Sequence, residues 1–406
     1  MATFQKVKLG DITEIVSGGT PDSSNLDYWG NGNINWATLP DLHHKYLLDT
    51  HRKITELGLK NSSAKLLPVN TVIFSSRATI GEVSIAKVPT STNQGSKNFI
   101  CDPSKVNFEY LYYSLKFNAK KIEQLATGAT YKEINKTDFS NVEIALPDLP
   151  TQSRIASVLS AYDDLIENNE KRIKALEEMA SRLYTEWFVK FKSPGNEKVQ
   201  MVDSGTEFGM IPEGWEVKIF GDVVNVQYGY TASAEENNDY PKYLRGMDIN
   251  KRSFIDWKDV PNCKISEQDF KKYKIRKGDV FIIRMADPGK IGICEREVNA
   301  VFASYLMRLS IKKDVTPYYL YYFVTSERYQ GFVLGASGGT TRKSINSQQV
   351  IAINVLIPEC DVLESFESKV GLFREELTKL IQQNNSLSKT RDLLIPQLVT
   401  GRQELK

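Results

Sequence analysis

The feature that most constrains this chain is a heptad pattern in residues 151–188. Apolar or core-type residues recur there in alternating steps of three and four. This average spacing is typical of a coiled-coil seam, which needs a partner helix, rather than of the wider apolar stripe on a surface helix. Thr151 is a reasonable helix start, and Ser193-Pro194-Gly195 a reasonable end. The predicted seam positions are Leu159, Tyr162, Ile166, Asn169, Ile173, Leu176, Ala180, Leu183 and Trp187.

A second segment, residues 361–399, repeats the pattern and could supply the partner. Asp361 and Glu364 predict a capping-box start, and Pro396 and Gly401 are expected to mark the end. Each seam contains one asparagine, and a polar core residue can fix the register of a coiled coil. The alternative for either asparagine alone is a rotated, solvated position. The seam positions are Phe366, Val370, Phe373, Leu377, Leu380, Asn384, Leu387, Arg391, Leu394 and Leu398.

The chain also contains an internal repeat. Leu9-Gly10-Asp11 recurs 211 residues later as Phe220-Gly221-Asp222, and GATYKEIN at 128–135 recurs at the same offset as GTTRKSIN at 339–346. Each copy ends in Leu-Pro or Ile-Pro directly before a heptad segment. We therefore predict one unit written twice, a globular domain followed by a long helix.

Short β-branched runs bounded by turn residues predict strands in both copies. They span residues 71–75, 82–86, 97–101 and 141–145, and again 279–283, 290–295, 306–311 and 352–357, whereas 110–124 and 317–333 look helical. This mixture predicts an α+β fold, with two similar globular domains joined by two long antiparallel heptad helices. The expected parts are a first domain (1–150), a central helix (151–192), a linker (193–214), a second domain (215–358) and a C-terminal helix with its tail (359–406).

The repeat also suggests how the two helices would align. A duplicated molecule with a pseudo-twofold axis should pair them antiparallel, and if Asn169 faces Asn384, the residue numbers in every facing pair sum to 553. Tyr162 would then face Arg391, where a stacked guanidinium would satisfy the layer. The apolar layers would be Leu159 with Leu394, Ile166 with Leu387, Ile173 with Leu380, Leu176 with Leu377, Ala180 with Phe373, Leu183 with Val370 and Trp187 with Phe366.

Composition is that of a globular protein with two or more domains, since 406 residues exceed one ordinary core. A net charge of +2 does not exclude local basic patches. The four cysteines lie far apart without a CxxC, so we expect free thiols in a reducing compartment rather than zinc or disulfides. Because there is no signal-peptide core and no apolar run of ~20 residues, we expect a cytoplasmic protein without membrane contact.

Catalytic signatures are not convincing in this sequence. The stretch 335–344 resembles a phosphate-binding loop but has Arg342 where the second glycine is required. Dinucleotide, methyltransferase and HExxH motifs are also missing. His43, His44 and His51 sit in a polar segment without metal-ligand spacing, which favours surface positions. We therefore expect no metal site and a binding role.

Basic, aromatic and small residues recur at equivalent points of the two copies. Such loops can read DNA, with Arg or Lys against guanine, Asn or Gln against adenine and aromatic rings against bases. The alternative for each basic residue is a solvated or phosphate-contacting side chain, and for Gly128 and Gly339 a simple turn. The candidate DNA-binding residues are Gly19, Thr20, Arg77, Asn93, Gln94, Lys97, Thr130, Tyr131, Lys132, Tyr228, Tyr230, Arg245, Arg284, Ser304, Tyr305, Thr341, Arg342 and Lys343.

These patterns resemble the specificity subunit of Type I restriction-modification systems, the HsdS family, over nearly the whole chain. The resemblance rests on the duplication, on residues 128–135, on LPDLPTQSRI at 146–155 and on LLIPQL at 393–398. The second copy departs from it in having Ala303-Ser304-Tyr305 where the first has Asn93-Gln94-Gly95. That departure is expected if the two domains read different sequences.

The resemblance implies two target recognition domains, each reading half of a split site in double-stranded DNA about one turn, ~34 Å, apart. It implies a non-catalytic chain that binds no cofactor itself. Its partners would be two modification subunits, which use S-adenosylmethionine to methylate adenine, and restriction subunits, which use ATP and Mg²⁺. Two alternatives stay open: a coiled-coil adaptor for proteins, and a DNA methyltransferase or nuclease in its own right.

Overall fold

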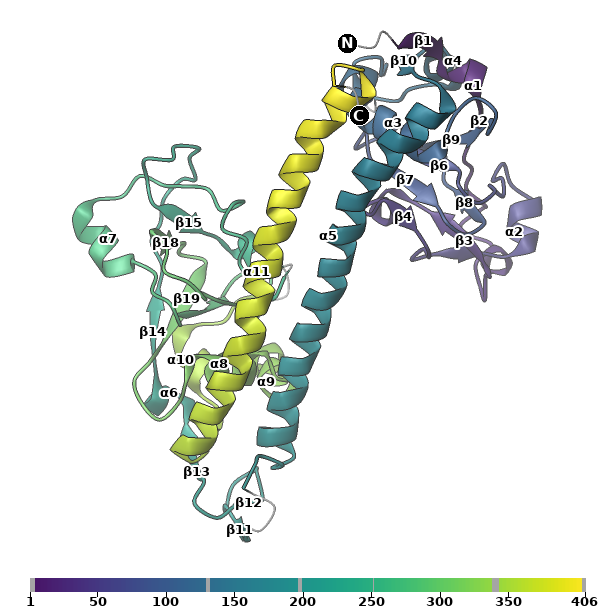
Figure 1. The fold of residues 1–406 in the computed structure, drawn as a ribbon. Coiled ribbons are helices and arrows are strands. Elements are labelled where there is room, and N and C mark those ends of the chain that lie inside the picture. Colours follow the sequence, from purple (N-terminus) through teal and green to yellow (C-terminus); the bar gives the residue numbers. More distant parts are fainter. Residues whose placement is uncertain (1–3, 129–131, 196–198, 251, 338–342, 404–406) are drawn as a thin grey trace. The chain divides into compact units, whose positions relative to one another are not determined.

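The computed structural model describes residues 4–128, 132–195, 199–250, 252–337 and 343–403. They fall into two compact units: unit 1 is drawn from residues 1–168 and 383–406, and unit 2 from residues 169–382. Two long helices, α5 (Leu149–Tyr184) and α11 (Cys360–Val399), each contribute to both units (Figure 1). No helix in the described part combines the length and apolar character needed to cross a membrane.

Unit 1 is built on a five-stranded sheet in the order β2-β9-β6-β7-β4, and the 16-residue helix α3 (Phe108–Glu123) lies against β6 and β7 (Figure 1). A small sheet, β5-β3-β8, and the pair β1-β10 complete the fold. The strands are β1 (Gln5–Lys8), β2 (Thr13–Ser17), β3 (Ile34–Ala37), β4 (Tyr46–Leu47), β5 (Lys53–Ile54), β6 (Val72–Ser75), β7 (Val83–Ala86), β8 (Thr90–Thr92), β9 (Ser96–Cys101) and β10 (Glu143–Leu146); the short helices are α1 (Leu9–Ile12), α2 (Glu56–Lys60) and α4 (Lys136–Ser140).

Unit 2 repeats this plan. Its main sheet has the order β14-β19-β16-β17, with β15-β18 as the small sheet and β13-β20 as the extra pair. The strands are β13 (Glu216–Ile219), β14 (Val224–Tyr228), β15 (Lys242–Leu244), β16 (Val280–Ile283), β17 (Ile291–Ile293), β18 (Ala300–Phe302), β19 (Leu306–Ile311) and β20 (Asn354–Ile357); the helices are α6 (Phe220–Val223), α7 (Glu267–Tyr273), α8 (Pro317–Thr325), α9 (Glu327–Ala336) and α10 (Ser347–Ile351). The predicted repeat and the mixed α and β content are confirmed.

The central strands are apolar at successive positions because both faces of each sheet are covered. Side chains alternate between faces along a strand. In β6, Val72 and Phe74 join the core under α3, whereas Ile73 joins a separate cluster on the other face. In β16, Val280 and Phe281 divide in the same way between two clusters.

Both long helices complete the hydrophobic cores of the domains. In unit 1, Leu159 of α5 and Leu398 of α11 belong to the same buried cluster as the helix α3. In unit 2, Trp187, just beyond the end of α5, and Phe366 of α11 belong to the main core. None of the predicted seam residues is exposed. Each domain therefore packs onto the helices through apolar surface rather than through a flexible tether.

The helices also contact each other within each unit. In unit 1, Asp163 forms an ion pair with Arg391, and the Asn384 side chain donates a hydrogen bond to the carbonyl of Ile166 at 3.3 Å. The predicted partner of Arg391 was Tyr162, so the ion pair falls one residue further along α5. Because residue numbers rise along α5 while they fall along α11, the paired segments run antiparallel in this unit.

The same direction holds in unit 2. Arg172 and Glu376 form an ion pair at 2.8 Å, and Ile173 packs with Leu377 and Leu380. The rings of Trp187 and Phe366 lie 6.0 Å apart, as the predicted register requires.

Three sequence predictions need correction. Residues 317–333 form two helices rather than one, because Ser326 interrupts them and its hydroxyl accepts a hydrogen bond from Tyr329 N at the start of α9. Pro396 lies inside α11 rather than after it. The predicted linker, 193–214, includes a hairpin of β11 (Met201–Asp203) and β12 (Met210–Pro212), and Ile211 joins the core of unit 2.

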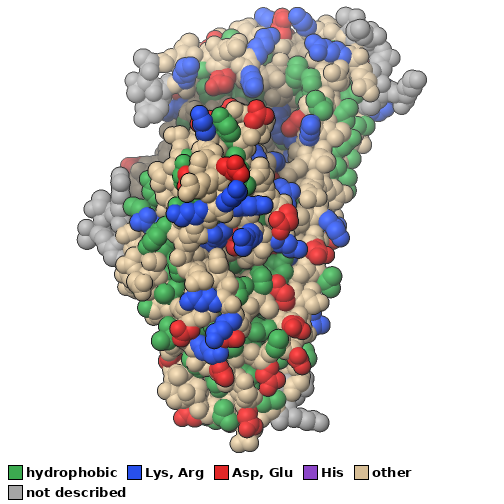
Figure 2. All heavy atoms as spheres, turned by 90° about the vertical axis from the view of Figure 1, so that its left-hand side faces the viewer, with side chains coloured by type: hydrophobic (Ala, Val, Ile, Leu, Met, Phe, Trp, Pro, Cys, Tyr) green, Lys and Arg blue, Asp and Glu red, His purple; other side chains and the backbone are tan. Residues whose placement is uncertain are grey.

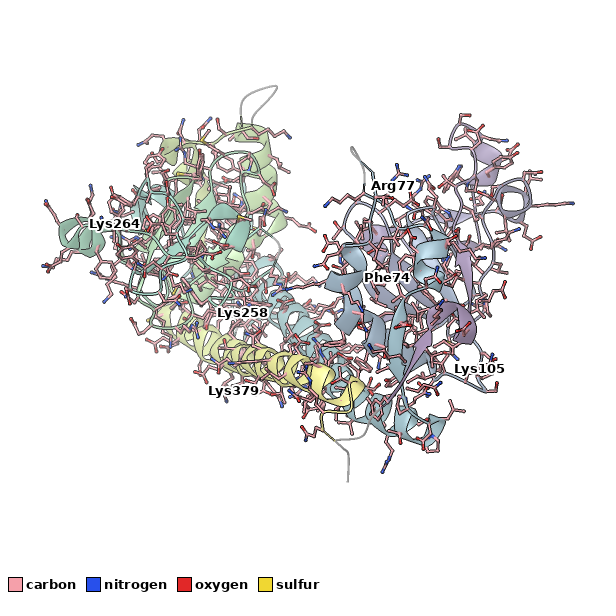
Figure 3. The ribbon with its side chains drawn as sticks, turned by 90° about the horizontal axis from the view of Figure 1, so that it is seen from above. Phe74, Arg77, Lys105, Lys258, Lys264 and Lys379 are labelled. Atoms are coloured by element: carbon pink, nitrogen blue, oxygen red, sulfur yellow. The ribbon has the colours of Figure 1, made fainter. Side chains whose placement is uncertain are left out.

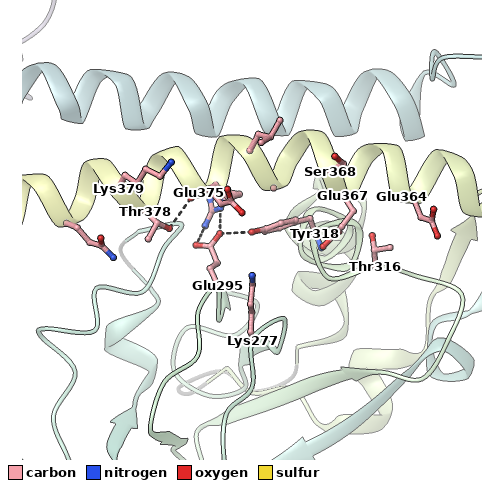
Figure 4. Close-up of a pocket in the computed structure, with 14 residues that line it drawn as sticks. Lys277, Glu295, Thr316, Tyr318, Glu364, Glu367, Ser368, Glu375, Thr378 and Lys379 are labelled. Carbon is pink, nitrogen blue, oxygen red and sulfur yellow. Dashed lines mark hydrogen bonds and ion pairs between the residues drawn. The ribbon is translucent and has the colours of Figure 1, made fainter.

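A buried arginine of α11 attaches that helix to the domain of unit 2, whose Glu295 points toward α11 in Figure 4. Arg374 is 1% exposed and pairs with Glu295, its Nη2 at 2.7 Å from the carboxylate. The same nitrogen donates to the carbonyl of Ser253 at 2.9 Å. Beside this contact, in a pocket of about 730 Å³, Glu367 accepts a hydrogen bond from the Tyr318 amide at 2.9 Å and so caps the first turn of α8.

A repeated glycine is explained by crossing backbones. A Cβ atom on Gly18 would lie 1.9 Å from the carbonyl oxygen of Asn93, and one on Gly229 would lie 2.2 Å from that of Ala303. These separations are far below van der Waals contact, so only glycine fits at either position.

We expect Gly229→Ala to lower the free energy of unfolding by about 1–3 kcal/mol or more, because the backbone of Ala303 must move to admit a methyl group. Gly331→Ala, inside α9 and facing open space, is the matched control and should gain about 0.5–1 kcal/mol. Urea denaturation of both variants measures the difference. Equal stabilities would contradict the steric explanation.

We expect Glu367→Gln to change how stability depends on pH. Burial raises the pKa of Glu367 despite the hydrogen bond from Tyr318. A raised folded-state pKa gives stability that is complete below the unfolded pKa of about 4.3 and is lost as the pH rises through the folded pKa. The free energy of unfolding of the variant should therefore exceed that of the unaltered chain, by a margin that grows as the pH rises from about 4.3 through the raised pKa of Glu367.

Urea titrations across that pH range measure the margin. Glu375→Gln, at an exposed position of the same helix, is the control and should leave the pH dependence unchanged. A margin for Glu367→Gln that does not vary with pH would show that the carboxyl is not destabilised by burial.

Candidate nucleic-acid interface

Three chain segments meet at the end of the central strand in both units, held by backbone hydrogen bonds. In unit 1, Ser76 follows β6; its amide donates to Gly95 O at 2.8 Å, and its carbonyl accepts from Ile134 N at 3.2 Å. In unit 2, Arg284 follows β16; its amide donates to Tyr305 O at 3.0 Å, and its carbonyl accepts from Ile345 N at 2.9 Å. The two units thus share one backbone scaffold, on which different side chains stand.

The scaffold of unit 1 lies at one side of its domain. In Figure 3, Arg77 of unit 1 and Lys105 lie on opposite sides of the buried Phe74. The turn that follows the central strand is the same in both units, since Ala78 and Ala286 adopt φ values of 64° and 69°.

In unit 1 the scaffold brings several predicted residues together. The Thr20 hydroxyl contacts the amide oxygen of Gln94, and both side chains are exposed. Gly19 is buried, and its carbonyl accepts a hydrogen bond from Trp36 Nε1 at 2.9 Å. The side-chain oxygen of Asn93 accepts from the Gly95 amide at 3.0 Å, so this group shapes the turn.

Lys97 differs from the prediction because it is buried. Its ammonium lies 3.2 Å from the Glu133 carboxylate and 3.4 Å from the Ser76 hydroxyl, and the residue is 4% exposed. These contacts tie β9 to the segment that carries Glu133. Lys132 next to it is exposed, and Arg77 is half-buried.

In unit 2 the scaffold carries an arginine and two tyrosines. The guanidinium of Arg284 lies 5.0 Å from the ring centroid of Tyr228, and its Nη1 donates to Ser304 O at 3.4 Å. The Tyr228 hydroxyl accepts from the Ser347 amide at 2.9 Å, which fixes the ring. Tyr305 is 59% exposed beside them.

Two other predicted residues of unit 2 have structural contacts. Arg245 donates to Asp248 from Nε and Nη2 at 3.1 and 2.9 Å, so its guanidinium is held in its own turn. The carbonyl of Tyr230 accepts from the Tyr243 hydroxyl, whose pKa is raised by burial and which therefore stays a donor. Lys343 is exposed, whereas Thr130, Tyr131, Thr341 and Arg342 lie outside the described residues.

Sequence reasoning missed two further groups. Arg52 stacks over Trp29, with its guanidinium 3.8 Å from the ring centroid. In unit 2, six exposed basic residues fall within 14 positions at and around α7, and Figure 2 shows Lys and Arg side chains to be numerous on that face. They are Lys264, Lys271, Lys272, Lys274, Arg276 and Lys277. The density of Lys and Arg in residues 264–277 was the available signal.

Exposed basic and aromatic side chains on a rigid backbone can contact phosphates and base edges. Among the described residues, no group of three or more His, Cys, Asp or Glu could hold a metal ion.

Comparison with known proteins agrees with this arrangement. The family model of the Type I restriction modification DNA specificity domain matches residues 1–178 and again 212–368. The chain belongs to this specificity family. The resemblance predicted from the sequence is therefore confirmed, and the two matched ranges follow the internal repeat.

Individual specificity-family relatives match most of the chain. The specificity subunit of the MjaIX enzyme of Methanocaldococcus jannaschii is 32% identical, with 97% of this chain and 92% of the relative covered. The HindI specificity subunit of Haemophilus influenzae is 21% identical over 99% of this chain and all of the relative. The crystal structure of the S subunit from M. genitalium has the same fold, with a TM-score of 0.59 at 15% identity over 99% of this chain and 97% of that one.

We expect Lys97→Met to lower the free energy of unfolding by about 1–3 kcal/mol, because it leaves Glu133 and Ser76 without their buried partner. Lys132→Met, which removes an exposed ammonium nearby, should be close to neutral. Thermal and urea denaturation compare them. If the two variants were equally stable, Lys97 would have no structural role.

Proposed function

We propose that this chain is the DNA specificity subunit of a Type I restriction-modification complex and that each of its two domains reads one half of a bipartite target. The observation that carries the proposal is the shared backbone scaffold, on which the two units present different side chains that are exposed or, in Arg284, half-buried. Unit 1 presents Thr20 and Gln94 there, whereas unit 2 presents Arg284 and Tyr305. Two such readers suit two different half-sites, and membership of the specificity family supports this role.

The basic residues of unit 2 suit the DNA backbone. The Lys and Arg residues of 264–277 would contact phosphates and supply salt-dependent affinity, while the scaffold side chains specify bases. An adaptor that binds only proteins would not require both the basic cluster and the scaffold side chains of unit 2.

The two long helices would form an antiparallel coiled coil that sets the distance between half-sites, about one DNA turn or ~34 Å. The ion pairs and apolar contacts between α5 and α11 in each unit support this arrangement.

The chain would act without catalysis of its own and would bind no cofactor. Modification subunits that use S-adenosylmethionine to methylate adenine, and restriction subunits that use ATP and Mg²⁺, would supply the chemistry. Exposed faces of α5 and α11 and the domain surfaces beside them would dock the modification subunits.

Co-expression of the chain with its modification subunits, followed by methylation profiling of the host genome, tests the proposal. One bipartite motif with a fixed spacer is the expected result. Methylation without a split motif, or methyl transfer by the chain alone, would contradict the proposal.

We expect insertion of one heptad into both α5 and α11 to lengthen the tolerated spacer without altering either half-site. Seven residues add ~10 Å of helix, which corresponds to about three base pairs. The same seven residues placed after Gly205, in the β11–β12 turn where a Cβ meets open space, form the control and should leave the spacer unchanged. A change of half-site sequence in the heptad variant would show that the helices do more than set distance.

A further inference from the structure

The surroundings of half-buried Arg284 differ from those of the other buried or half-buried arginines that the structure describes in unit 2. Buried Arg374 is paired with Glu295, Arg308 with Asp279 and Arg245 with Asp248. No acidic partner faces Arg284 among the described residues. Its only side-chain hydrogen bond there is the 3.4 Å contact from Nη1 to the Ser304 carbonyl, and its Nε is buried without a partner.

The Arg284 guanidinium is nevertheless held in place. It lies over the ring of Tyr228, which is itself fixed by the hydrogen bond from the Ser347 amide. Its backbone is bonded on both sides by the scaffold, to Tyr305 and to Ile345. A guanidinium that is positioned but not neutralised keeps donors available for an external acceptor, and little rotamer freedom remains to be lost when it binds one.

The acceptor that fits this arrangement is the edge of a guanine. Guanine presents O6 and N7 side by side in the major groove, and the planar fork of arginine donates to both at once. We propose that Arg284 reads a guanine in the half-site of unit 2, with Tyr228 as the platform that orients the guanidinium; this inference rests on the proposed function above.

The corresponding position of unit 1 is Ser76, which is fully buried, and the nearby ammonium of Lys97 is bound to Glu133. Unit 1 therefore has no arginine at the position equivalent to Arg284, and its candidate Arg77 stands one residue further along the chain. The inference assigns the guanine contact to one half-site only.

The test uses the complete complex of this chain with its modification subunits, carrying Arg284→Gln or Arg284→Lys. Methylation profiling should show one position of one half-site relaxed from guanine, with the other half-site unchanged. On duplexes that differ only at that position, the preference for guanine should fall about tenfold to a hundredfold in both variants. Lysine keeps the positive charge but lacks the two parallel donors of the guanidinium. A loss of guanine preference in Arg284→Lys therefore shows that arginine contacts the guanine through two hydrogen bonds.

The controls separate base reading from other roles. Tyr228→Leu removes the ring on which the guanidinium lies and should weaken the preference for guanine. Tyr228→Phe keeps that ring but loses the hydrogen bond from the Ser347 amide, so it should weaken the preference less than Tyr228→Leu. Nε of Arg284 is buried without a partner, so replacing the side chain breaks no hydrogen bond of that atom. The Arg284 variants should therefore have the same melting temperature as the unaltered chain. A lower melting temperature with every duplex weakened equally would mark Arg284 as structural.

Two other outcomes would overturn the inference. If Arg284 contacts a phosphate, Arg284→Gln would weaken binding to all duplexes equally. The slope of the logarithm of the binding constant against the logarithm of the salt concentration would then fall in magnitude by about one, whereas Arg284→Lys would keep both the affinity and the slope of the unaltered chain. If the methylated motif is unchanged in every variant, Arg284 does not read a base. Failure of the proposed function itself is distinguishable, because the unaltered complex would then methylate no defined sequence.

Discussion

Each globular domain borrows part of its hydrophobic core from the long helices. Leu159 and Leu398 are fully or almost fully buried in unit 1, as are Phe366 and Val370 in unit 2. Burying one such side chain contributes about 1.5–3 kcal/mol, so several of them hold a domain firmly on its helices. A domain could not swing away from its helices without opening its own core. The buried pair of Arg374 and Glu295 adds a directional contact to this apolar attachment.

The same scaffold can carry different readers because its hydrogen bonds are made by the backbone. Ser76 and Arg284 use the same amide and carbonyl contacts although their side chains differ in size and charge. Gly18 and Gly229 are likewise independent of the side chains around them, since each is required by the close approach of another backbone segment. The residues that face DNA can therefore vary while the frame that presents them is kept.

Periodic and repeated features of this fold were predictable from the sequence. The heptad steps predicted both long helices, and the repeat predicted two domains of one plan, because each signal is local or self-similar. The sequence did not predict the helix break at Ser326, because the apolar residues of α8 and α9 lie on both sides of it and look like those of one continuous helix. Pro396 was read as a stop, yet α11 continues because Leu398 and Val399 are buried in the core of unit 1 and offset the cost of the proline.

The candidate site was predicted less well, and the reason is tertiary. Lys97 and Arg245 appeared as basic residues in loops, but their acidic partners Glu133 and Asp248 are identified only by the fold. The backbone position of Arg284 could be inferred from the repeat. Its lack of an acidic neighbour could not, because that depends on every segment packed around it.

The division of the chain has a consequence for its synthesis. Unit 2 is continuous in sequence, so all of its apolar partners have left the ribosome once residue 382 has emerged. Unit 1 is completed by the segment 383–406, and the Tyr110 hydroxyl donates a hydrogen bond to the carbonyl of Val399 in that segment. During synthesis the apolar face around Leu159 must therefore stay uncovered until the part of α11 that follows residue 382 has been made. Of the two units, unit 1 begins to be translated before unit 2 and is completed after it.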